Sequence, residues 1–95
     1  SFISVVQKPG DTDMLTVRAR IQGDIESVFP EAHVEADKGT DYKYRARLSR
    51  QTVAQVLQDQ VMNLNWGNFK GAVKDRKRHD AYMKVWRAMY AVQGR

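Results

Sequence analysis

The feature that most constrains the fold is the stretch 41–48, Asp-Tyr-Lys-Tyr-Arg-Ala-Arg-Leu, in which apolar and cationic residues alternate without interruption. Successive side chains of a β-strand point to opposite faces, so this pattern is typical of a strand with one face on a core and one face in water. The side chains expected on the core are Tyr42, Tyr44, Ala46 and Leu48, and those expected in water are Lys43, Arg45 and Arg47.

The residues before this stretch predict three more strands and a short helix. Residues 2–7 are rich in β-branched side chains, and residues 14–21 alternate, so the two form a first hairpin around Pro9-Gly10. A helix is expected between Gly23 and Pro30. It should end before Pro30, because Pro disfavours the helical conformation of the residue before it. Residues 32–37 alternate again and predict a second hairpin with 41–48.

After residue 48 the apolar period changes to three and four, which indicates helices. We expect them to begin at about Ser49, Asn65 and Asp80, with a polar joint over 76–80. The whole order is strand, strand, helix, strand, strand, helix, helix, helix. It predicts an α+β fold of two layers: an antiparallel sheet of two hairpins with helices on one face. With 95 residues, the chain 1–95 is expected to be a single domain.

The composition indicates the cellular environment of the chain and the charge of its partner. The chain has no cysteine, which removes disulfides and thiol chemistry and fits a reducing cytoplasm. No apolar run approaches the roughly 20 residues of a membrane span, so we expect no membrane partner. The net charge is +5, and residues 70–95 carry eight cations and two anions. This asymmetry indicates an acidic or polyanionic partner.

A basic sheet face is the first candidate binding surface. If both hairpins share one sheet, five outward cations project together and can contact phosphates: Arg18, Arg20, Lys43, Arg45 and Arg47. The alternative is a solvated face whose charge is balanced by Glu35 and Asp37, which would lie beside Lys43 and Arg45. The aromatic rings of Tyr42 and Tyr44 are expected on the covered face, which weakens the hypothesis of base stacking.

Two further candidate surfaces lie in the second half of the chain. A basic helix ridge comprises Lys70, Lys74, Arg76, Lys77 and Arg78. It is either a phosphate-contacting ridge or a solvated helix end. A set of aromatic residues widens the apolar face of the last helix: Tyr82, Trp86 and Tyr90. Such residues are usually core, but a helix that is apolar so far round is also typical of one that packs on a partner or on a second subunit, as in a homodimer.

Catalytic patterns are absent from the sequence. The two histidines, His33 and His79, have no carboxylate at an obvious spacing for general acid–base chemistry. There is no nucleophile elbow, no zinc-protease motif and no Gly-rich phosphate loop. We therefore expect no catalytic residue, no metal site, no cofactor and no enzyme activity.

The chain also resembles a family of small uncharacterised proteins of bacteriophages and bacteria. The resemblance spans nearly the whole chain and rests on Phe2-Ile3-Ser4-Val5-Val6, Leu15-x-Val17-Arg18-Ala19-Arg20, Phe29-Pro30, Asp41-Tyr42-x-Tyr44-Arg45, Asn68-Phe69-Lys70 and His79-Asp80-Ala81-Tyr82 leading to Val85-Trp86-x-x-Met89. Asn65-Trp66-Gly67 departs from the Asp-Tyr expected before Asn-Phe-Lys. The resemblance carries no established activity, but it implies an accessory role in the host cytoplasm.

Together these observations favour a non-enzymatic binding module that docks on a host protein with an acidic surface, through basic and aromatic residues. The alternative is a DNA- or RNA-binding protein that contacts phosphates with weak sequence preference.

Overall fold

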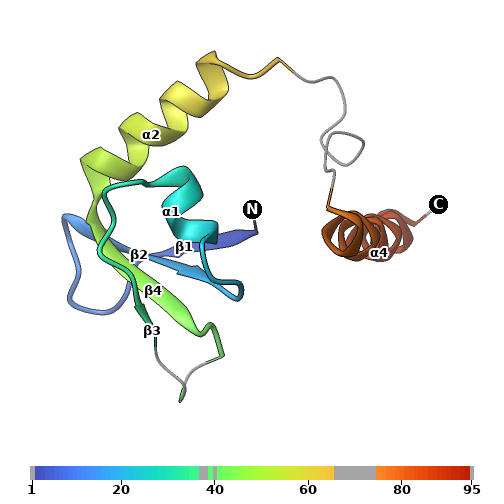
Figure 1. Cartoon of the computed structure of the whole chain (residues 1–95), viewed down its shortest axis with the longest axis horizontal. Helices are drawn as coiled ribbons and strands as arrows, with labels where there is room; N and C mark the ends of the chain where they lie inside the picture. Colours follow the sequence, from blue (N-terminus) through green and yellow to red (C-terminus); the bar gives the residue numbers. More distant parts are fainter. Residues whose placement is uncertain (1, 37–38, 40, 66–74, 95) are drawn as a thin grey trace. The chain divides into compact units, whose positions relative to one another are not determined.

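The structure is a computed structural model, and it describes residues 2–36, 39, 41–65 and 75–94 (Figure 1). The chain divides into two compact units, Ser1–Asn63 and Leu64–Arg95. The expectation of a single domain stays a prediction. Within the described residues, no helix is long and apolar enough to cross a membrane.

The first unit contains a four-stranded antiparallel sheet. Its strands are β1 (Ile3–Val6), β2 (Met14–Ala19), β3 (Glu35–Ala36) and β4 (Tyr44–Ser49), and they lie side by side in the order β1-β2-β4-β3. The two predicted hairpins therefore share one sheet through the pairing of β2 with β4. The α+β class and the order of strands and helices are confirmed.

The core lies on one face of this sheet. Helix α1 (Asp24–Val28) and helix α2 (Arg50–Met62) pack over β2 and β4 (Figure 1). The buried apolar side chains come from all four elements and from the residue after α1: Val17, Ala19, Ile25, Phe29, Ala46 and Val53. The alternating residues of β2 and β4 supply the sheet half of this core, as the period of two predicts.

The other face of the sheet, which we call the open face, carries the alternate residues of the same strands. The cross-strand register joins Arg18 to Arg45 and Thr16 to Arg47, and it joins Ser4 of β1 to Arg18. Residues directly opposite each other project from the same face, so these side chains form one surface.

A tight turn from Lys8 to Asp11 connects β1 to β2. The Asp11 N–H donates to the Lys8 carbonyl at 3.0 Å, and Gly10 has a φ of 87°. Pro fixes the φ that the second position needs, and Gly accepts the positive φ of the third. The turn brings Asp11 back over the end of the sheet, where it contacts β4.

The paired strands are shorter than the sequence predicts. β4 begins at Tyr44 instead of Asp41, and β3 comprises Glu35 and Ala36 alone. Residues 41–43 precede the strand. The alternating sequence pattern of 41–48 therefore begins before the hydrogen-bonded part of β4. At the other end, Ser49 caps α2 as expected: its hydroxyl accepts a hydrogen bond from the Thr52 N–H at 3.0 Å.

In the second unit the described helix is α4, which spans Arg76–Gln93. It begins four residues before the expected start, and the prediction of a polar joint over 76–80 is wrong. Asp75 caps the helix by accepting the Arg78 N–H at 3.2 Å, so the basic run forms the first turn of α4. The helix expected from Asn65 falls on residues 66–74, outside the described residues.

Candidate binding site on the open face

Three of the five predicted cations meet on the open face, and two lie at its border. Arg18, Arg45 and Arg47 project from neighbouring positions of β2 and β4. Arg20 follows the last residue of β2, and Lys43 precedes the first residue of β4. The basic sheet face predicted from the sequence is thus a smaller group of three arginines with two flanking cations.

Tyr42 lies against these cations, and its predicted place on the core face is wrong. The guanidinium carbons of Arg18 and Arg20 lie 4.4 and 4.2 Å from the centre of the Tyr42 ring. A guanidinium group over an aromatic face is attracted by the ring's quadrupole. Two of the five cations are therefore already engaged with a ring of the same chain.

Further contacts restrain the same two arginines. Arg18 donates from Nη2 to the Ser4 hydroxyl at 2.8 Å. Arg20 forms an ion pair with Asp41, with Nη1 and Oδ1 3.3 Å apart. The hydrogen bond and the charge of Asp41 raise the pKa of Arg20 above its ordinary value. Because both partners of this ion pair are exposed, its contribution to stability is small.

The Tyr42 ring should contribute measurably to the stability of the first unit. We expect Tyr42→Ala to lower the free energy of unfolding by about 1 kcal/mol, chiefly through the lost contact with half-buried Arg18. Tyr42→Phe keeps the ring and should lose less. Urea denaturation followed by the amide signals of β2 and β4 measures both variants. Equal losses for Ala and Phe would show that the hydroxyl, and not the ring, supplies the stability.

Arg47 is engaged by a residue that the sequence analysis did not single out. Its Nη2 donates to Oδ1 of Asp11 at 2.6 Å, and the Asp11 side chain is only 13% exposed. Charge-assisted hydrogen bonds of this length are the strong ones. The pairing spans 36 residues of sequence and depends on the shape of the Lys8–Asp11 turn, so no local spacing could have predicted it.

Arg50 binds the rest of the loop between β1 and β2, and the sequence analysis did not single it out either. Its guanidinium group donates to the Thr12 carbonyl at 3.3 Å and to Oε1 of Gln7 at 3.2 Å. Its backbone N–H donates to the Asp13 carbonyl at 2.7 Å. The first residue of α2 therefore fastens the β1–β2 loop and, with it, the position of Asp11.

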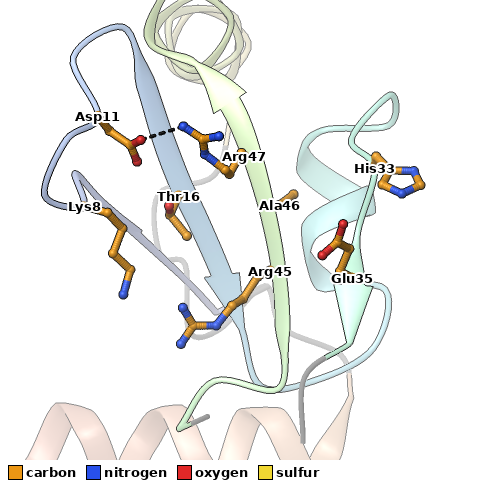
Figure 2. Close-up of a pocket in the computed structure, with 8 residues that line it drawn as sticks. All are labelled: Lys8, Asp11, Thr16, His33, Glu35, Arg45, Ala46 and Arg47. Carbon is orange, nitrogen blue, oxygen red and sulfur yellow. Dashed lines mark hydrogen bonds and ion pairs between the residues drawn. The ribbon is translucent and has the colours of Figure 1, made fainter. Parts of the chain in front are cut away.

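Between the loop and the strands the open face is hollowed to a volume of about 470 Å³, which we call the sheet hollow (Figure 2). The segment 33–35 borders it on one side, and the Lys8–Asp11 turn borders it on the other. Buried Thr16 of β2 lies between them. The lining residues are Lys8, Asp11, Thr16, His33, Glu35, Arg45, Ala46 and Arg47.

Lys8 and Arg45 are the cations of the sheet hollow without a carboxylate partner among the described residues. The Arg45 Nε donates to the Tyr42 carbonyl at 3.4 Å. Figure 2 shows the Arg45 side chain extending from β4 across β2, away from Glu35 and His33. The Lys8 side chain lines the same hollow from the turn. Two cations thus border one concave surface.

The predicted neutralisation of this face by Glu35 is not observed. Glu35 lies directly opposite Arg45 in the register of β3 and β4, as expected. Among the described residues, however, no ion pair joins the two side chains. Asp37, the other expected anion, lies outside the described residues. Lys43 instead places its ammonium group 5.6 Å from the centre of the Tyr44 ring.

The two other predicted surfaces belong to the second unit. Lys70 and Lys74 of the basic helix ridge lie outside the described residues, whereas Arg76, Lys77 and Arg78 form the first turn of α4. No residue of α4 is buried. Trp86 and Tyr90 stack with ring centres 5.2 Å apart and remain 46% and 42% exposed. Tyr82 is half-buried and accepts a hydrogen bond from Arg78 Nη1 at 3.4 Å.

The two histidines, His33 and His79, belong to different units of the chain. His33 lines the sheet hollow, and His79 lies in α4 with its Nδ1 3.8 Å from Oδ1 of Asp80. The part of the chain that the structure describes holds no group of three or more His, Asp or Glu residues that could bind a metal ion. Apart from Ala46, the residues that line the sheet hollow carry charged and hydrogen-bonding side chains.

Comparison with the models of protein families, with curated proteins and with solved structures gives no match for this chain. The resemblance to small phage and bacterial proteins stays a prediction.

Proposed function

We propose that the protein is a non-enzymatic binding module that docks on an acidic segment of another protein through the sheet hollow. The observation that supports this most directly is the pair Lys8 and Arg45, which line one hollow without a carboxylate partner among the described residues. A carboxylate that enters the hollow gains two charge-assisted contacts, and Thr16 adds a hydroxyl group beside them.

The charge pattern around these two cations favours a protein partner over a nucleic acid. Asp11 and Glu35 line the same hollow, and Asp41 lies at the border of the open face. A continuous row of phosphates would meet these three carboxylates as well as the arginines. A protein surface can place an anion on Arg45 and a cation beside Glu35, and such complementary patterns set orientation and specificity.

The resemblance noted in the sequence adds one element to this proposal. If the chain is of phage type, the acidic partner is a host protein and the complex forms in the host cytoplasm. The exposed Trp86 and Tyr90 of α4 supply aromatic side chains of the kind that dominate the binding energy of interfaces.

The test uses the full chain with a peptide rich in Glu and Asp and the same peptide with Gln and Asn in their place. We expect the acidic peptide to bind, with shift changes at the residues of the sheet hollow, and the neutral peptide not to bind. Arg45→Ala should weaken binding by about tenfold. The matched control is Arg20→Ala, which removes the same charge from a residue held by Asp41 outside the hollow.

A nucleic-acid function is the second candidate, because Arg18, Arg45 and Arg47 do lie together on one face. It predicts that duplex DNA or single-stranded RNA binds more tightly than the acidic peptide and loses affinity steeply between low and moderate salt. That result, together with equal effects of Arg45→Ala and Arg20→Ala, would overturn the protein-binding proposal.

A further inference from the structure

Strand β1 forms an edge of the sheet that carries no charged side chain and no Pro. β1 pairs with β2 on one side, and no described strand pairs with its other side. Exposed edges in monomeric proteins are usually blunted by charged side chains, by Pro or by a bulge. Residues 2–6 are Phe-Ile-Ser-Val-Val and contain no charge and no Pro. Residues 3–6 of the edge therefore offer backbone donors and acceptors beside uncharged side chains, whereas the Phe2 N–H already donates to Oδ2 of Asp24 at 3.2 Å.

The helices also leave the core side of this edge partly uncovered. α1 and α2 pack over β2 and β4, which lie further into the sheet. Val5 lies opposite Val17 in the register, yet Val17 is completely buried and Val5 is 38% exposed. Phe2, at the start of the strand, is also exposed. An added strand beside β1 would cover the side chain of Val5 and satisfy the outer backbone groups.

We propose that this strand is β1 of a second copy of the chain, paired antiparallel across a twofold axis at Ser4. Residues directly opposite each other in an antiparallel pair project from the same face. With the axis at Ser4, Ile3 lies opposite Val5 of the second copy, and Phe2 lies opposite its Val6. Apolar side chains meet on both faces, and no charged residue lies in the paired stretch. The two sheets join into one.

This arrangement has a consequence for docking. Because opposite residues share a face, the open faces of both copies lie on the same side of the joined sheet. Two sheet hollows then face one partner, and a partner with two acidic segments binds with avidity. A four-residue strand pair buries less surface than a standard stable interface, so the dimer is weak and forms as concentration rises. The pairing itself does not rest on the proposed function.

A single engineered cysteine tests the register, because the chain has no cysteine of its own. In the proposed dimer, Ser4→Cys places two thiols directly opposite each other, within the Cα separation that a disulfide requires. Under mild oxidation we expect this variant to shift from monomer to dimer on a non-reducing gel. Ala54→Cys, exposed on α2, is the collision control and should cross-link far more slowly. Val5→Cys brings two thiols opposite each other only if the twofold axis lies at Val5, so faster cross-linking of Val5→Cys than of Ser4→Cys would overturn the proposed register.

Sedimentation velocity of the cysteine-free chain supplies the second measurement. The sedimentation coefficient should rise with concentration for the natural sequence, and Val5→Lys should abolish the rise by placing a charge on the edge. Amide spectra of the Val5→Lys variant serve as the control that it still forms the sheet. The proposal is overturned if the natural sequence stays monomeric at all concentrations, if Ser4→Cys cross-links no faster than Ala54→Cys, or if the association survives Val5→Lys.

Discussion

Phe29→Ala is expected to destabilise the first unit by about 3 to 5 kcal/mol, which approaches the whole stability of a small domain. The Phe29 side chain is 2% exposed and belongs to the core formed with Val17, Ile25 and Val53. Only six apolar side chains among the described residues are buried, so few neighbours can relax into the space that the ring leaves. The cost therefore combines lost apolar burial with an unfilled cavity.

The stability of Phe29→Ala has to be measured with a probe that lies in the sheet. Both tryptophans, Trp66 and Trp86, follow Asn63 in the sequence, so the first unit contains no tryptophan whose fluorescence could report on it directly. Amide hydrogen exchange of β2 and β4 does, and we expect its protection to collapse in Phe29→Ala. Phe29→Leu should retain part of the protection. Val61→Ala, at a side chain 68% exposed on α2, should change the stability by less than about 0.5 kcal/mol. Similar losses in Phe29→Ala and Val61→Ala would contradict the assigned core.

The sequence was sufficient for the fold class and for the two faces of the central strands. Alternation placed Ala46 on the core and Arg18, Arg45 and Arg47 on the opposite face, because side-chain direction in a paired strand follows from backbone geometry alone. The α+β order followed from the change of period after residue 48. Only the meeting of Arg18 with Arg45 and Arg47 on one face also depended on the pairing of β2 with β4.

Alternation failed at Tyr42 because the ladder ends before it. The last register pair of β2 and β4 joins Ala19 to Tyr44, so Tyr42 lies beyond the pairing of β4 with β2. Its ring lies instead against the guanidinium groups of Arg18 and Arg20. A strand pattern therefore predicts side-chain faces only as far as the hydrogen bonds extend, and the pattern itself does not mark that limit.

The contacts that shape the candidate site are of long range and were not predictable. Asp11 reaches Arg47 through the geometry of one tight turn, and Arg50 reaches the same loop from the start of α2.

The start of α4, in contrast, could have been predicted, because the sequence carries a local signal for it. Asp75 precedes the basic run at a position where an Asp side chain caps a helix, and this signal outweighs the polar character of 76–80.

Arg45→Glu is expected to lower affinity for an acidic peptide by on the order of 100-fold, the second of the two largest effects. The change removes an attraction in the sheet hollow and adds a repulsion at the same point, together about 2 to 3 kcal/mol. Glu35→Arg should have the opposite sign and tighten binding, because Glu35 lies opposite Arg45 and lines the same hollow. Isothermal titration with the acidic peptide measures both changes.

The double variant Arg45→Glu with Glu35→Arg separates local recognition from general charge. It exchanges two neighbouring side chains across β3 and β4 and leaves the net charge of the chain unchanged. If the position of Arg45 over β2, beside Lys8, determines binding, the exchange places a carboxylate there and affinity stays low. If only the total charge of the open face matters, affinity returns to that of the natural sequence. Full recovery would therefore contradict a defined site in the sheet hollow and leave a diffuse basic surface as the basis of docking.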